Sequence, residues 1–436
     1  MPILVLRPRT GTTAPPPPPA VPTSGPSFVA RARYTLEVAW EGVAAGTFRL
    51  GTSLLGGTHT LALSPFDITF TGPYDNLSPF LREATVDRGV GPGGDRMTAA
   101  TATFRARDPD GRFNPRNQGG PLYGLLAERR QQIRWRGHVD TTVYPLFYGF
   151  VENLEWTALR RGPGGYVEIS CRDLFTWLED TYPVITATGP TTTGTAIGKV
   201  LDSAGWTDPA SRSLETGDLI PDFAADGTKT SLQLIRDLLE AERGTFFIAR
   251  DGKATYRSRT WALTRNSAAT IVGQMVDARP SLDHTRTANK AQVKRTQNNY
   301  VATAEDIGHR SRFGPRDIPL LESAYLASDS TADSLAAQLL AHGLNPRSLV
   351  REFAIDNRTP ELLVQVLGRE LGDVVTAVTE DVGLAEAFQI QRVRHDLRGV
   401  RHTATWALDD YKVIDPFTIG ASLLSPNAAT DGPVLV

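Results

Sequence analysis

The chain has 436 residues, of which 40% are hydrophobic and 22% are charged, and its formal net charge is −2. Such a composition belongs to a globular protein with a real core, and the length corresponds to two to four domains. This net charge excludes an overall positive potential that would favour nucleic-acid binding. A single cysteine, Cys171, excludes an intramolecular disulfide and any site with several cysteine ligands. We expect a buried structural thiol there, because its neighbours are apolar.

The first 30 residues are proline-rich and include five consecutive prolines at 15–19. Proline lacks a backbone N–H and favours extended polyproline II. Residues 1–30 are therefore either a linker or an extended arm that lies on a neighbouring subunit. The apolar run at the N-terminus is too short for a signal peptide, which predicts synthesis in the cytoplasm. No run of about 18 apolar residues occurs, so we expect no membrane span.

Residues 31–185 are predicted to form a first β-domain. Apolar and polar residues alternate there in short runs separated by glycine-rich turns. The runs that predict strands are 34–40, 47–50, 60–63, 66–70, 97–104, 131–135 and 146–156.

Residues 186–272 are predicted to form an α+β insert. Apolar residues at helical spacing predict a helix over 193–206, with Gly205 as a C-cap, and a second over 230–242, ended by Gly244. A shorter helical pattern at 173–180 precedes them. Asp251-Gly252 lies between two alternating runs and predicts a β-hairpin.

Residues 273–412 are predicted to form a second β-domain, followed by a C-terminal tail at 413–436. Its expected elements are a helix over 332–343 and strands over 290–297, 348–355, 374–378, 388–395 and 400–408.

Two long hairpins in the two β-domains resemble each other. The first spans 147–156 and 165–173, and the second spans 388–397 and 401–410. They indicate two related domains, although any two β-hairpins share such features. The predicted fold is mainly β, with two related β-barrel-like domains and a smaller helix-hairpin insert.

Few residues have the spacing that catalysis or metal binding requires. None of the seven histidines form an i, i+4 pair, and no Gly-x-Ser-x-Gly, Walker A or His-Glu-x-x-His motif occurs. His395 and His402 fall on facing strands of one hairpin, where opposed surface histidines are favoured over a metal site. We therefore predict no catalytic site, no cofactor and no metal.

The run Asp-Pro-Asp-Gly-Arg-Phe-Asn-Pro at 108–115 is rich in turn residues. It lacks the acidic spacing of a calcium loop. Pro109 fixes φ, Gly111 suits a positive φ, and Asn114 and Pro115 begin a second turn. The predicted double turn supplies candidate structural or subunit-contact residues, which are Asp108, Asp110, Gly111, Arg112, Phe113, Asn114, Pro115 and Tyr123.

A basic cluster surrounds Trp135. Arg129, Arg130, Arg134 and Arg136 beside an aromatic residue allow nucleic-acid binding. Given the overall charge, we favour a solvated strand face with salt bridges between subunits.

Stretches in a fixed order resemble the minor tail proteins of phages that infect actinobacteria. In that order they are the 101–117 strand and loop, Gly-Pro-Leu-Tyr-Gly at 120–124, a basic strand at 130–134 and Phe-Tyr-Gly-Phe-Val at 147–151. The helix and hairpin at 231–253 resemble the insert of tail hub proteins. Residues 371–375 and 388–395 resemble the second β-domain of the hub.

The resemblance implies a tail hub at the tip of the virion, synthesised in the host cytoplasm. Such a hub is a homotrimer in which two barrel-like domains per chain give pseudo-sixfold symmetry. It closes the tail tube and contacts the distal tail protein ring, the tape-measure protein and other tail-tip proteins. DNA passes through its channel without sequence-specific binding, and nothing catalytic is implied.

Two other functions remain open. One is the distal tail protein, which forms the hexameric ring itself. The other is a glycan-binding or cell-wall-hydrolysing protein, because aromatic and acidic residues lie near one another. The residues that suggest the second function are Trp156, Tyr166, Trp177, Glu152, Glu155 and Glu179.

Overall fold

The computed structural model describes residues 30–40, 74–90, 97–126, 131–159, 164–187, 189–259, 261, 267–272, 278–283, 287–344, 347–379 and 384–410. The proline-rich segment before residue 30, the predicted strands 47–50, 60–63 and 66–70, and the tail at 413–436 lie outside these residues.

A 13-stranded sheet dominates the molecule, which confirms the mainly-β prediction. Its first half contains β1 (Arg33–Ala39), β2 (Asp75–Asn76), β3 (Leu81–Val90), β4 (Met97–Asp108), β5 (Gln132–Val139), β6 (Thr142–Ala158) and β7 (Gly165–Arg172). Its second half contains β15 (Ala269–Val272), β16 (Ala278–Asp283), β20 (Arg347–Asp356), β21 (Val374–Thr379), β22 (Leu384–Arg398) and β23 (Arg401–Asp410).

The two halves repeat one pairing pattern. The first runs β3-β4-β7-β6-β5 and the second runs β16-β20-β23-β22-β21, with every neighbouring pair antiparallel. The hairpins β6–β7 and β22–β23 contain a register shift at the same position. It lies between Val151 and Asn153 in the first and between Ile390 and Arg392 in the second. The sequence repeat at 147–173 and 388–410 therefore corresponds to a repeated topology.

The matching bulges fix a residue-by-residue correspondence between β6 and β22. Just before the bulge, Val151 N donates to the Gln131 carbonyl at 2.8 Å, and Ile390 N donates to the Asp373 carbonyl at 2.9 Å. Asn153 of β6 thus corresponds to Arg392 of β22.

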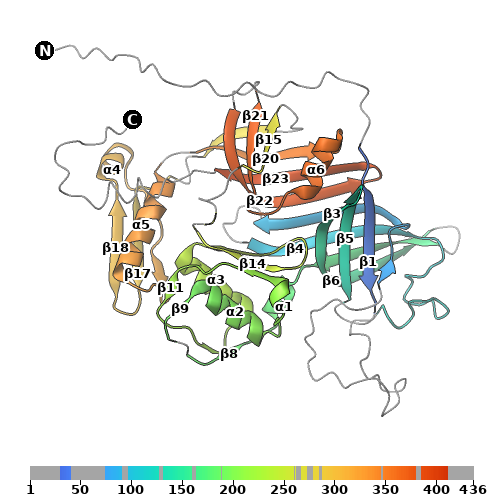
Figure 1. Cartoon of the computed structure of the whole chain (residues 1–436), viewed down its shortest axis with the longest axis horizontal. Helices are drawn as coiled ribbons and strands as arrows, with labels where there is room; N and C mark the ends of the chain where they lie inside the picture. The colour runs from blue at the N-terminus through green and yellow to red at the C-terminus, as the bar shows by residue number, and fades with distance from the viewer. Residues whose placement is uncertain are drawn as a thin grey trace.

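The halves join edge to edge through β22 and β3 (Figure 1). Seven consecutive pairs run from Arg392 with Gly89 to Arg398 with Glu83. The Arg392 guanidinium also forms an ion pair with Asp87 across this junction. One continuous sheet therefore spans both halves.

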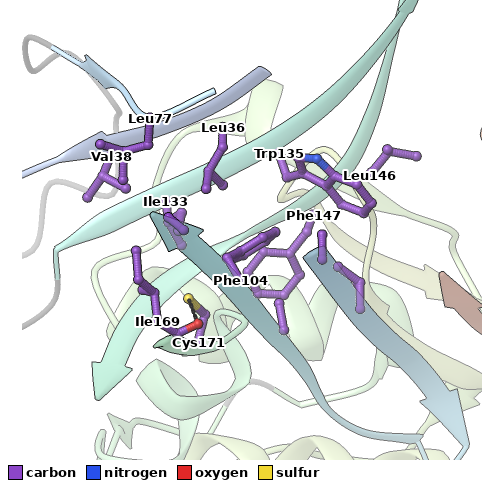
Figure 2. Close-up of a cluster of buried hydrophobic side chains, with 14 of the residues drawn as sticks. Leu36, Val38, Leu77, Phe104, Ile133, Trp135, Leu146, Phe147, Ile169 and Cys171 are labelled. Atoms are coloured by element: carbon purple, nitrogen blue, oxygen red, sulfur yellow. Dashed lines mark hydrogen bonds between the residues drawn. The ribbon is translucent and has the colours of Figure 1, made fainter. Parts of the chain in front are cut away.

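The core of the first half lies against this sheet. Figure 2 shows Phe104, Trp135 and Phe147 packed together, each at most 1% exposed. Phe104 and Trp135 meet edge to face, with centroids 5.8 Å apart. Cys171 lies in the same cluster at 2% exposure, which confirms the expected buried thiol.

An α+β insert follows β7. Its helices are α1 (Phe175–Glu179), α2 (Thr193–Ser203), the 3-10 turn η1 (Pro209–Ser211) and α3 (Ser231–Glu242). Its strands are β8 (Val184–Ile185), β9 (Thr191–Thr192), β10 (Arg212–Leu214), β11 (Leu219–Ile220), β12 (Ala225–Asp226), β13 (Thr245–Ile248) and β14 (Ala254–Arg257). The predicted helices and the hairpin β13–β14 are confirmed.

Local signals account for α3. Thr230 and Gln233 form a capping box at its start. At its end Arg243, with φ of 59°, adopts the left-handed conformation that we expected a glycine to supply. The helix therefore ends one residue before the predicted Gly244.

A second small unit lies within the predicted second β-domain. It contains β17 (Lys290–Arg295), β18 (Tyr300–Glu305), α4 (Ile307–Phe313), β19 (Leu321–Ser323) and α5 (Asp329–Gly343). The strands pair in the order β18-β17-β19, and the unit has its own hydrophobic cluster around Val293 and Leu335. Figure 1 shows it apart from the large sheet.

A last helix, α6 (Pro360–Gly368), connects β20 to β21. Leu363 and Leu367 of α6 belong to the hydrophobic core of the first half. The second half therefore also holds the first through helix packing.

Candidate functional site

Asp108 organises the predicted loop at the end of β4. Its Oδ1 accepts from Arg112 N at 2.8 Å, and its Oδ2 accepts from Phe113 N at 3.1 Å. Oδ2 also accepts from Trp156 Nε1 at 2.7 Å. Because Asp108 is fully buried, these three donors compensate for the desolvation of its carboxylate.

The rest of the loop is closed by contacts to β2 and to its own backbone. Arg112 Nη2 lies 2.6 Å from Asp75 Oδ2, and Asn117 Nδ2 donates to the Gly111 carbonyl at 3.0 Å. Gly111 has φ of +68°, as the predicted turn requires.

The candidate contact residues divide into a buried and an exposed set. Phe113 is completely buried and packs against Trp40, with centroids 5.9 Å apart. Asp110 and Pro115 are exposed, and Tyr123 is 49% exposed. Arg112 and Asn114 are partly buried and lie between these two sets. The exposed residues are the most accessible to another protein, whereas Asp108 and Phe113 shape the loop from inside.

His395 and His402 are buried rather than opposed on the surface, so the expectation of surface histidines is wrong. His395 Nδ1 lies 3.1 Å from His402 Nε2, and His402 Nδ1 lies 2.7 Å from Tyr34 Oη. The alternating pattern placed the two histidines on facing strands, but it could not show that Tyr34 of β1 and Trp135 of β5 pack against them. Burial lowers the pKa of His395 well below its usual value and that of His402 to about 3.

Asn357 ties three distant segments together beside these histidines. Its Nδ2 donates to the carbonyls of Ala30 and Val400 at 2.8 and 2.9 Å, and its Oδ1 accepts from His402 N at 3.1 Å. Asn357 and the Tyr34–His402 bond thus join the start of the described chain to the β22–β23 turn and to β23.

An ionic network joins the first half, the insert and the second half. Arg88 of β3 lies 2.5 Å from Glu370 Oε1, and Arg250 N donates to Glu370 Oε2 at 3.0 Å. Burial raises the pKa of Glu370, but the charges of Arg88 and Arg250 outweigh it, so the pKa lies below its usual value. No sequence motif marked these residues.

Arg134 and Arg136 of the basic cluster form salt bridges within the chain, and the expected salt bridges between subunits stay a prediction. Arg134 Nε lies 2.6 Å from Glu37 Oε2, Arg136 pairs with the same carboxylate, and the Arg134 guanidinium stacks 3.6 Å from the Tyr74 ring centroid. The neighbouring strand β1 supplies Glu37, a partner that the local sequence does not reveal. Arg129 and Arg130 lie outside the described residues.

The aromatic and acidic residues that suggested glycan chemistry have structural partners. Trp177 is buried and donates to the Ala204 carbonyl at 2.8 Å, and Trp156 donates to Asp108. Glu152 and Glu179 both face Arg172, at 3.3 and 3.9 Å.

Within the described part of the chain, no three His, Cys, Asp or Glu side chains gather closely enough to hold a metal ion. No helix among these residues is long and apolar enough to span a bilayer.

Two solved structures share this architecture. The tail protein from Neisseria meningitidis MC58 matches with a TM-score of 0.56 and 11% identity, covering 86% of this chain and 97% of that one. The 43 kDa tail protein of prophage MuSo2 from Shewanella oneidensis matches with a TM-score of 0.54 and 11% identity, covering 88% and 98%. No family model and no curated protein matches the sequence. The chain shares the fold of these two tail proteins.

Proposed function

We propose that this chain is a non-catalytic structural protein of a phage tail and forms the hub at the tail tip. The repeated pairing order of the two sheet halves is the observation that carries the proposal. Two similar halves per chain allow three chains to present six similar units, which suits a protein that must sit on a hexameric ring. The fold shared with two tail proteins supports the same assignment.

In this role the trimer closes the tail tube and joins the distal tail protein ring to the tape-measure protein and other tip proteins. DNA passes through its channel without sequence readout, in keeping with a net charge of −2. The motif order at 101–151 points to a siphophage of actinobacteria as the source.

The 108–115 loop is the proposed contact region of this assembly. Asp110, Pro115 and Tyr123 face outward and reach a neighbouring subunit or tail protein, whereas Asp108 holds the backbone beneath them. A buried carboxylate with three donors gives the loop one fixed shape, which a repeated contact requires.

Native mass measurement on the full-length protein tests this assignment. We expect a species of three times the chain mass of 47.4 kDa, formed alone or with the distal tail protein. A six-copy ring would instead favour the distal tail protein. A chain that stays monomeric in both preparations would overturn the hub assignment.

A further inference from the structure

The N-terminal and C-terminal parts of strand β6 pair with different strands. From Thr142 to Phe150 the strand pairs with β5, and from Phe150 to Ala158 it pairs with β7 on its other edge. Beyond Val151, no described strand pairs with the edge that β5 has left. We call Asn153–Ala158 with this edge the free edge of β6.

The corresponding edge of β22 is covered. Residues Arg392–Arg398 of β22 pair with β3, after β21 has ended. Because Asn153 corresponds to Arg392, the free edge of β6 occupies the position that β3 covers in the second half. The chain therefore contains one complete copy of this junction and one incomplete copy.

Side-chain burial differs in the same way. Val393 and Leu397 of β22 are 0% and 4% exposed. Leu154 of β6, which corresponds to Val393, is only half-buried, and Ala158, which corresponds to Leu397, is exposed. The inward-facing side chains of β6 thus lack the cover that β3 gives to those of β22.

The backbone of the free edge is also oriented for pairing. Leu159 N donates to the Gly164 carbonyl at 2.9 Å in the β6–β7 turn. Since N–H groups of a strand alternate between its edges, those of Leu154, Trp156 and Ala158 point away from β7. Leu154 N donates to the side-chain Oδ1 of its neighbour Asn153 at 2.9 Å, so the N–H groups of Trp156 and Ala158 are the ones open to another strand. An edge with such unpaired groups is a template for another strand.

The strand that would fill this position is β16. In the repeated order β16 corresponds to β3, and it begins the described path of the large sheet, with β20 on one edge. One chain thus carries the free edge of β6 at one junction and a strand equivalent to β3 at the other. The two are complementary but cannot pair within one chain if the halves keep the arrangement of the β22–β3 junction.

We propose that the free edge of β6 pairs antiparallel with β16 of a second copy, so that the sheet continues from chain to chain as it does from β22 to β3. This inference rests on the proposed function, since it specifies how copies of the hub associate. Such a head-to-tail contact closes into a ring when the rotation per copy allows it. Pro280 of β16 lacks an N–H, so we expect a shorter ladder than the internal one.

Disulfide trapping in the full-length chain tests the pairing. At the internal junction Asp396 pairs with Thr85. The bulge correspondence maps Asp396 onto Thr157. The pairing of β3 with β4 and of β16 with β20 maps Thr85 onto Arg279, which lies at the register shift of β16 between Ala278 and Pro280. We prepare Thr157→Cys and Arg279→Cys as separate proteins, mix them and oxidise mildly. Thr142→Cys replaces Thr157→Cys in the control, because Thr142 is another exposed threonine of β6 but pairs with Val139 of β5. Cys171 is buried and does not compete.

We expect a cross-linked dimer when Thr157→Cys and Arg279→Cys are mixed, and none with either protein alone or with the Thr142→Cys control. A second variant, Ala158→Pro, removes one N–H that points to the free edge and leaves the β6–β7 bonds in place. It should fold with an unchanged thermal midpoint and lose the oligomer.

The outcomes separate this proposal from the hub assignment. If the chain forms oligomers but the Thr157/Arg279 mixture cross-links no better than the control, the edge pairing is wrong and the hub assignment stands. If the chain is monomeric in every preparation, including those with tail proteins, both are wrong.

Discussion

Arg88 and Glu370 form an ion pair between the two sheet halves although 282 residues separate them in the chain. Arg88 is 3% exposed, and the same carboxylate accepts the backbone N–H of Arg250 in the insert. One side chain of the second half thus fixes the position of the other two regions.

Glu370→Gln should therefore destabilise the fold strongly. The substitution leaves the buried Arg88 guanidinium without an opposite charge, which costs about 3 kcal/mol in the free energy of unfolding. Urea unfolding of the purified chain measures it. Glu83→Gln is the control, since Glu83 and Arg105 lie 4.0 Å apart and are about half exposed, and its effect should be within about 0.5 kcal/mol. Equal effects of the two substitutions would contradict a structural role for the Arg88–Glu370 pair.

Asp108→Ala should release the 108–115 loop from its fixed conformation and destabilise the fold. It removes the acceptor of Arg112 N, Phe113 N and Trp156 Nε1, leaving donors unpaired in a buried place. We expect a loss of about 3 kcal/mol in the free energy of unfolding. Asp110→Ala changes an exposed carboxylate in the same loop and should cost less than about 0.5 kcal/mol. A mild effect of Asp108→Ala would show that the loop is held by other contacts.

These two sites show what sequence reasoning could and could not reach. The double turn at 108–115 carries its own signals, Pro109 and Gly111, and so do the capped helix α3 and the hairpin at Gly252. Alternation along β4, β6 and β22 predicted strands because it reflects burial on one face. Glu370 has no such signal, because its partners come from a strand and a turn far away in the chain.

Other elements were missed although local signals exist. Helix α6 begins with Thr359 as N-cap, Pro360 in its first turn and Glu361 after it, all typical of a helix start. The strands of the 287–344 unit are no longer than six residues, so alternation alone could not separate them from the large sheet. Which strands are neighbours, and hence the repeated order, follows only from three-dimensional pairing.

The buried histidines should make stability depend on pH. An unfolded histidine titrates near pH 6.5, whereas His402 in the fold has a pKa of about 3. Between these values the unfolded chain binds more protons, so stability falls as the pH drops below about 6.5. His402→Gln removes this proton uptake. The difference in unfolding free energy between the wild-type chain and His402→Gln should therefore be smaller at pH 5 than at pH 7, by about 2 kcal/mol.

A second buried group acts in the opposite direction and requires its own control. Burial raises the pKa of Asp173 to about 7, so its contribution to stability is present at low pH and is lost as the pH rises towards 7. Asp173→Asn should therefore steepen the loss of stability on acidification, while His402→Gln flattens it. Denaturant unfolding of each variant at pH 7 and pH 5 checks both signs. If the unfolding free energy of the two variants changed equally between these pH values, His402 and Asp173 would not contribute in opposite directions.

Tyr123→Ala should weaken assembly without affecting the folded chain. Tyr123 is 49% exposed beside the ordered loop, so its truncation should change the free energy of unfolding by less than about 0.5 kcal/mol. If Tyr123 anchors a contact, self-association measured by ultracentrifugation should weaken by at least about fivefold. Tyr182→Ala, 60% exposed on the insert, is the matched control. Equal association of both variants would remove Tyr123 from the proposed contact.

The copy number of the chain in purified tails tests the central claim most directly. Quantitative mass spectrometry of tail particles, with the distal ring protein as the internal standard, measures it. The hub assignment predicts three copies of this chain for every six of the ring protein, because each chain supplies two similar sheet halves. Six copies, or no copies at all in the tail, would contradict it.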